Sequence, residues 1–202
     1  MSDKQKTDLL ISSKEKELAL KDKLLREKEI KLNELQNTLN SLDSVINRLN
    51  GIVTNALLGF KSDEISVEIK NGKVYVSMSD KLLFKSGSAS IEKKGKEALV
   101  LLADVLSKNQ DIDILVEGHT DNIPIKTAVY KDNWDLSVAR ATSIIRILTE
   151  EYKIDPKRVT PAGRGEFIPK TSNENAEGRA QNRRTEIILS PKLDELFKLI
   201  HK

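Results

Sequence analysis

An acidic and a basic residue stand at the two ends of one connecting segment, residues 117–141, which reads EGHTDNIPIKTAVYKDNWDLSVARA. Asp121 follows the short apolar run 112–116, and Arg140 lies in the second turn of an apolar-periodic stretch that begins at Trp134. A guanidinium fork binds a carboxylate through two parallel N–H groups, and a carboxylate accepts hydrogen bonds from an ammonium group. Asp121 and Arg140 therefore predict a site for a zwitterion. The alternative is that the two side chains bond to each other and fasten the loop.

Catalytic and metal chemistry find little support in the residue types. The chain has no cysteine, and its two histidines are His119 and His201, the second next to the C-terminus. Thiolate sites are excluded, and a metal site built from His and Cys is disfavoured. A triad of His119, Ser137 and Asp135 would need Ser137 on a strained turn, whereas its surroundings predict a helix. We expect no catalytic residue, no bound metal and no cofactor, and we do not expect the protein to be an enzyme.

The segment GSASIEKKGKE resembles a phosphate-binding loop only superficially. Seven residues, where four are needed, separate Gly87 from Gly95, and neither Ser nor Thr follows Lys96. The segment is therefore not interpreted as a nucleotide site.

Alternating strand and helix patterns must position these residues. Asn71-Gly72 within residues 65–79 is a strong hairpin signal. Further patterns predict a helix at 91–107 capped by Ser90, a strand at 111–118, a helix at 134–152 capped by Asn133, strands at 158–162 and 184–189, and a last amphipathic helix at 191–200. This order is typical of an α/β (α+β) two-layer sandwich.

The N-terminal region has a different pattern, with apolar residues repeating every seven positions. One column holds Ile11, Leu18, Leu25, Leu32, Leu39, Ile46 and Val53; the column three residues later holds Lys14, Lys21, Lys28, Leu35, Leu42, Leu49 and Ala56. A seven-residue repeat favours a coiled coil, with a single solvated helix as the alternative. At ~1.5 Å per residue, residues 11–53 would span roughly 60 Å. We expect a parallel homodimer, and a domain that folds without residues 1–55.

Composition narrows the classes of partner. The 34 basic and 31 acidic residues give a net charge of +3, and aromatic residues make up 4%. This balance does not favour nucleic acid as a partner. No run approaches the ~20 apolar residues of a membrane span, and no secretory signal is present, so we expect any signal or anchor to lie outside this sequence.

Five segments together resemble the OmpA C-terminal-like family, the peptidoglycan-associating domain of outer-membrane proteins, lipoproteins and the flagellar stator subunit MotB. They are LLFKSGSASI, VEGHTDN, NWDLSVARATSIIRIL, RVTPAGRGEFIP and GRAQNRRTEIIL. The resemblance implies a mixed β-sheet with helices on one face, and non-covalent binding of the diaminopimelate side chain of cell-wall stem peptides. Residues 122–132 are longer than in many members and are similar to the MotB-like subset.

The resemblance also implies the residues that bind the ligand. Asp121 matches the Asp of the GHTD segment, Arg140 the Arg of the helix motif, and Arg183 the first Arg of NRR, a second carboxylate contact. Asn133 and Leu136 match residues that shape the pocket rim, and Thr120, also implied to be a binding residue, matches the strand end together with Gly118. His119 is interpreted as a structural or rim residue, and Arg184 as part of its strand and its salt bridges.

The expected protein is thus a coiled-coil stalk (1–58) joined to a peptidoglycan-binding domain (59–202). It would anchor a cell-envelope protein to the wall from the periplasm, in association with the outer membrane through an anchor absent from this sequence. The alternative, in a different functional class, is the periplasmic part of a MotB-like stator or another motor or transport complex.

Overall fold

A computed structural model of the protein describes residues 3–192, which fall into two compact units. The first is the N-terminal part of helix α1 (Asp3–Ala56), up to Leu42, and the second is residues 43–192. Most of the final amphipathic helix expected at 191–200 lies outside the described residues. No helix within residues 3–192 combines the length and the hydropathy that a membrane span requires.

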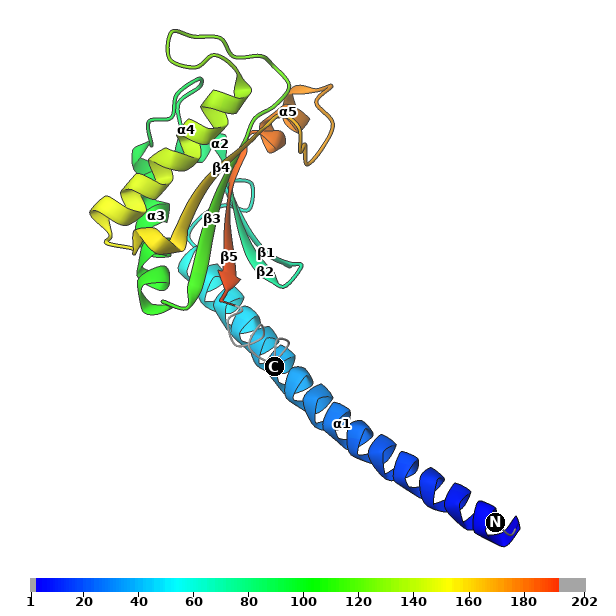
Figure 1. Ribbon diagram of the computed structural model, residues 1–202. Coiled ribbons are helices and arrows are strands. Elements are labelled where there is room, and N and C mark those ends of the chain that lie inside the picture. Colours follow the sequence, from blue (N-terminus) through cyan, green and yellow to red (C-terminus); the bar gives the residue numbers. More distant parts are fainter. Residues whose placement is uncertain (1–2, 193–202) are drawn as a thin grey trace. The chain divides into compact units, whose positions relative to one another are not determined.

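The second unit is a mixed α/β domain (Figure 1). Its strands are β1 (Ile65–Lys70), β2 (Lys73–Ser79), β3 (Ile112–His119), β4 (Val159–Gly165) and β5 (Arg184–Pro191). Its helices, after the end of α1, are α2 (Asp80–Leu83), α3 (Lys93–Lys108), α4 (Asn133–Arg146) and α5 (Ala176–Asn182), with a π-helical turn at Ile147–Glu151 and a 3₁₀ turn at Pro156–Arg158.

The five strands form one sheet in the order β1-β2-β5-β3-β4. The β3–β4 pair is parallel and the other pairs are antiparallel, which confirms the expected mixed sheet. β1 and β2 form the hairpin expected at Asn71-Gly72. Both turn residues have positive φ, 51° and 69°, as a tight hairpin turn requires.

Helices cover one face of this sheet, as expected for a two-layer sandwich, and Figure 1 shows α3 and α4 on the same side of it. One apolar cluster joins the helices to alternate positions of the strands, among them Val76, Val116 and Ile187, all 0% exposed. β3 therefore turns its odd-numbered positions Glu117 and His119 to the opposite face.

The end of α1 belongs to this domain. Ile46, Leu49 and Val53 are 6%, 2% and 0% exposed, and they join the core cluster of residues 43–192. The compact domain thus begins at Asp43, inside the segment that the heptad pattern assigns to the stalk. The last residues of the two apolar columns of α1 therefore pack in a globular core, and only the earlier residues of the columns are left for a coiled coil.

Two helices begin at other residues than the sequence predicted. The N-cap of α4 is Asp132, whose carboxylate accepts from the Asp135 N–H at 3.1 Å; the expected cap, Asn133, is the first helical residue. Glu92 precedes α3 in place of Ser90 and makes no side-chain cap bond. Adjacent polar residues compete for each cap, and the pattern of apolar residues does not decide between them.

Candidate functional site

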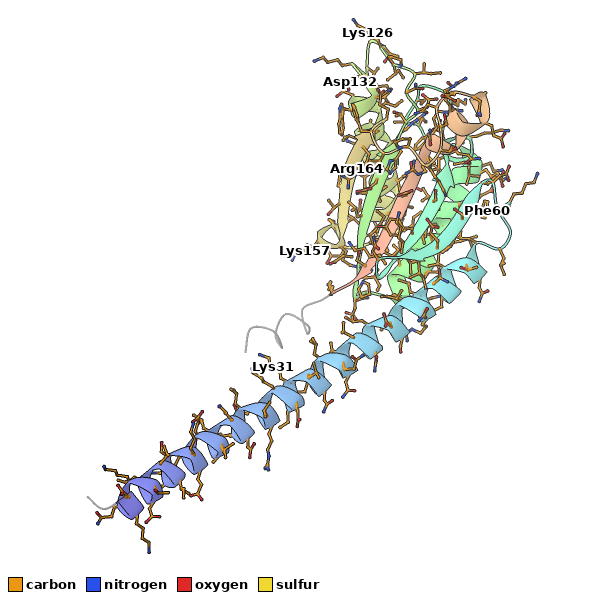
Figure 2. The ribbon with its side chains drawn as sticks, turned by 90° about the vertical axis from the view of Figure 1, so that its right-hand side faces the viewer. Lys31, Phe60, Lys126, Asp132, Lys157 and Arg164 are labelled. Carbon is orange, nitrogen blue, oxygen red and sulfur yellow. The ribbon has the colours of Figure 1, made fainter. Side chains whose placement is uncertain are left out.

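All six residues expected to bind the ligand line one groove. The groove measures about 1530 Å³ and lies where β3 ends and α4 begins, between α2, the 120–132 loop and the start of β5. The residues are Thr120, Asp121, Asn133, Leu136, Arg140 and Arg183. In Figure 1 the 120–132 loop extends beyond the end of β3, and in Figure 2 Lys126 marks its outer part and Asp132 its return to α4.

Asp121 is the second residue after β3 and is 5% exposed. One carboxylate oxygen accepts from the Ile123 N–H at 3.0 Å, and the other accepts from Arg183 Nη1. The carboxylate therefore both shapes the start of the loop and carries a charge partner. Thr120 supports this turn, because its hydroxyl donates to the Asp121 carbonyl at 2.9 Å.

Asn133 fastens the loop to the first turn of α4. Its amide nitrogen donates to Glu166 Oε2 at 2.6 Å and lies 3.3 and 3.2 Å from the carbonyl oxygens of Asp121 and Ile123. The side chain that was expected to cap the helix instead holds the loop that frames the groove. Leu136, one turn later and 5% exposed, gives the groove an apolar wall.

Arg140 lies deeper than a rim residue, at 2% exposed. Its Nη1 lies 2.8 Å from Asp80 Oδ1, and its Nη2 donates to Asp80 Oδ2 at 3.2 Å, a bidentate pair. Its Nε donates to the Ser88 carbonyl at 3.0 Å, and its guanidinium carbon lies 5.0 Å from the centre of the Phe84 ring. Arg140 is therefore a buried member of the groove lining, held in place by contacts within the domain.

Asp121 and Arg140 do not pair with each other; each has its own partner. Arg183 bonds Asp121 and also places its Nε 3.9 Å from Asp80 Oδ2. The charges therefore alternate along the groove in the order Asp121, Arg183, Asp80, Arg140. The side chain of Arg183 is 37% exposed, against 3% for Arg140, so Arg183 presents the more accessible cation.

Burial governs the protonation of the inner pair. Burial raises the pKa of the Asp80 carboxyl, while the nearby guanidiniums of Arg140 and Arg183 lower it in part. Burial likewise lowers the pKa of Arg140, and the Asp80 carboxylate opposes that change. Each ion of the pair depends on the other for its charge, because neither is well solvated.

Asp80 is the site residue that the sequence did not reveal. It is 9% exposed, and its backbone N–H donates to the Arg183 carbonyl at 3.0 Å, which places it beside the guanidinium. In the sequence, Asp80 is distinguished only as an acidic residue directly after the second strand of a hairpin. Such a residue is usually a turn former, and sixty positions separate it from Arg140.

The triad considered from the sequence is not assembled. Ser137 is fully buried on α4, and its hydroxyl donates to the Trp134 carbonyl at 2.9 Å. His119 points to the sheet face opposite α4, away from Ser137. His119 is 2% exposed, and the structural role expected of Arg184 is confirmed by its bond to Glu186 at 2.7 Å.

Several curated proteins are similar to this chain. Motility protein B of Bacillus subtilis is 35% identical over 129 residues, 64% of this chain and 49% of its own length. The probable lipoprotein YiaD of Escherichia coli is 35% identical over 127 residues, 63% of this chain and 56% of its own length. The chain thus spans about half the length of the curated relatives it matches.

Solved structures share the fold. A MotB-like protein of Desulfovibrio vulgaris superposes with a TM-score of 0.70 at 24% identity, covering 76% of this chain and 95% of that chain. The cell wall anchor of the T6SS from Pseudomonas aeruginosa superposes with a TM-score of 0.64 at 36% identity, covering 69% and 97%. The family model of the OmpA family matches residues 83–183, which hold Arg140, Asp121 and Arg183. The chain belongs to the OmpA family.

Proposed function

We propose that the groove binds the diaminopimelate side chain of a peptidoglycan stem peptide and that the domain thereby anchors a cell-envelope protein to the wall. The observation that carries the proposal is the alternation of charge along the groove, Asp121, Arg183, Asp80, Arg140. The end of the diaminopimelate side chain carries an ammonium and a carboxylate on one carbon atom. A row of opposite charges matches such a group better than it matches a simple cation or anion.

Each charge has a role in this proposal. The ligand ammonium lies against Asp121, whose carboxylate is held in place by the Ile123 N–H. The ligand carboxylate takes Arg183, the more exposed cation, together with N–H groups of Arg140. Arg140 has five N–H groups, and its contacts to Ser88 and Asp80 use three of them. Asp80 orients the Arg140 fork and does not itself touch the ligand.

The relatives support an anchoring role. One similar structure is described as a cell wall anchor, and other relatives are a lipoprotein and the outer membrane protein Omp38 of Acinetobacter baumannii. We accordingly place the domain in the periplasm, in association with the outer membrane.

A second candidate is the periplasmic part of a MotB-like stator. It is favoured by the 35% identity to Motility protein B of Bacillus subtilis and by the long 122–132 loop. Wall binding by the same groove would then serve to hold a motor in place. The reading frame that contains this sequence distinguishes the two: a lipoprotein signal supports the anchor, and a membrane helix with an acidic residue supports the stator.

Sedimentation with insoluble cell walls tests the ligand. We expect the protein to co-sediment with diaminopimelate-type walls and to bind Lys-type walls at least about tenfold more weakly, because Lys lacks the terminal carboxylate. Asp121→Asn should weaken binding by roughly 2–5 kcal/mol, since the ligand ammonium loses its partner. Asp113→Asn, at an exposed position on β3, is the matched control and should bind as the parent does. Equal binding of both wall types would show that diaminopimelate is not the ligand.

A further inference from the structure

A second cluster of charged side chains lies on the sheet face opposite the helices. Glu117 on β3 stands directly across from Glu186 on β5, and His119 stands across from Arg184. Glu117 is 5% exposed and His119 2%. Two carboxylates facing each other in an antiparallel pair repel, so this arrangement needs compensation. None of these side chains lines the groove that contains Asp121, apart from Arg184.

The compensation comes from two arginines, each on the outer oxygen of one carboxylate. Arg164, on β4 (Figure 2), donates through Nε to Glu117 Oε1 at 3.0 Å and also through Nη2. Arg184 donates through Nε to Glu186 Oε1 at 2.7 Å. The remaining oxygens, Glu117 Oε2 and Glu186 Oε2, both face the ring of His119, at 3.8 and 3.7 Å from its Nε2.

His119 itself has no hydrogen-bond partner among the described residues. Both its Nδ1 and its Nε2 are buried and unsatisfied. A buried polar atom without a partner costs about 1–3 kcal/mol, so its position next to two carboxylate oxygens requires an explanation. A direct hydrogen bond is not the explanation, because 3.7 and 3.8 Å are too long for one.

The spacing of the three atoms suits a shared ion. Glu117 Oε2, Glu186 Oε2 and His119 Nε2 define a triangle in which no pair is more than 4.8 Å apart. A point equidistant from the three atoms lies about 2.4 Å or less from each. Zinc–nitrogen and zinc–oxygen bonds measure about 2.0–2.2 Å. A movement of a few tenths of an ångström would therefore bring all three atoms to bonding distance.

We propose that Glu117, His119 and Glu186 form a binding site for a divalent transition-metal ion of the zinc class. One imidazole nitrogen and two carboxylate oxygens are a ligand set that such ions accept, with a fourth position left for water. Arg164 and Arg184 act as outer groups that fix the orientation of the two carboxylates. The ligand set needs no cysteine, which is why the cysteine count did not reveal it.

The protonation of His119 is compatible with this role. Burial, with a smaller contribution from the Arg184 charge, lowers the pKa of His119 to about 4. The imidazole is therefore neutral at pH 7 and has a free lone pair. Glu186 retains partial exposure, 16% of its side chain, and Arg164 is 45% exposed, so an ion can reach the site from the surface beside them.

Zinc titration of the whole chain tests the site. Calorimetry with zinc chloride should show one ion bound per chain, and saturating zinc should raise the melting temperature. His119→Gln and Glu186→Gln should each weaken zinc binding at least tenfold. His201→Gln removes the only other histidine and is the matched control, so it should leave zinc binding unchanged.

Crystals of the unaltered protein soaked in zinc give a measurement that does not depend on how the variants fold. Anomalous scattering at the zinc edge should show a peak between the three ligand atoms. The proposal is overturned if that position holds only a water molecule, if the parent binds no zinc, or if His201→Gln abolishes binding while His119→Gln and Glu186→Gln retain it.

Discussion

Among the single residues, Arg140 carries both a proposed ligand contact and a structural one. Its guanidinium forms a bidentate pair with Asp80 and is 2% exposed, so Arg140→Ala leaves a buried carboxylate without its cation. We expect a loss of about 3–5 kcal/mol in the free energy of unfolding, measured by urea denaturation. The double variant Asp80→Ala/Arg140→Ala should lose less than the sum of the two single losses, because both charges are then absent. Additive losses would contradict the pairing.

At the residue scale, the sequence predicted which side chains share the site but not which side chains they pair with. Asp121, Arg140 and Arg183 were expected in one site, and the structure brings them to one groove. Their partners were not predictable, because the pair of Arg140 with Asp80 depends on where the β1–β2 hairpin is placed in the sheet. Strand periodicity gives the face on which a side chain lies, but it does not give the order of the strands.

Glycines set how closely α4 approaches the sheet. A Cβ at Gly118 would lie 2.2 Å from the Ser137 carbonyl oxygen, and a Cβ at Gly163 would lie 2.5 Å from Ser137 Oγ. Gly118→Ala should therefore cost more than about 3 kcal/mol in the free energy of unfolding, because backbone has to move. The control is Gly51→Ala, in α1 with nothing within 4 Å, which should stabilise by roughly 0.5–1 kcal/mol. Thermal melts that show equal effects of the two substitutions would contradict close packing of α4.

Elements were predicted more reliably than their ends. The Asn71-Gly72 turn fixes its hairpin locally, through backbone conformations that those two residues adopt easily. The start of α4 depends instead on which neighbouring side chain bonds the first free N–H groups. Asp132 does so for α4, while Asn133 is drawn to the carbonyls of the loop. Tertiary contacts therefore decide the cap.

The end of α1 is part of the domain, so its removal should destabilise the domain. A chain of residues 43–202 retains Ile46, Leu49 and Val53 and should fold as the whole protein does. A chain of residues 56–202 loses all three, at about 1.5–3 kcal/mol each, where a domain has roughly 5–15 kcal/mol in all. We expect the shorter chain to be largely unfolded by circular dichroism, contrary to the expectation from the heptad pattern. Equal melting temperatures for the two chains would place the domain boundary after α1.

At the scale of the whole molecule, the stalk remains the predicted source of self-association. Ile46, Leu49 and Val53 are buried in the core of the domain, so a dimer seam has to be formed by residues that precede them in α1. Exposed residues such as Leu32 and Leu39, which are 66% and 40% exposed, are available for it. Only about two heptads there carry apolar residues in both columns, since the earlier second-column positions are lysines. Short coiled coils are weak, so we predict a parallel dimer whose population rises with protein concentration.

Two leucines of similar exposure make the seam testable by sedimentation equilibrium. Leu32, 66% exposed, lies in the first column, whereas Leu20, 70% exposed, lies outside both. Leu32→Lys should weaken association at least tenfold, because a leucine buried in the dimer seam is replaced by a charged side chain. Leu20→Lys should leave association unchanged. If association were general adhesion of exposed leucines, the two substitutions would weaken it equally. If the parent stayed monomeric at tens of micromolar, the stalk would act as a spacer alone, and the domain would carry out the proposed wall binding as a single copy.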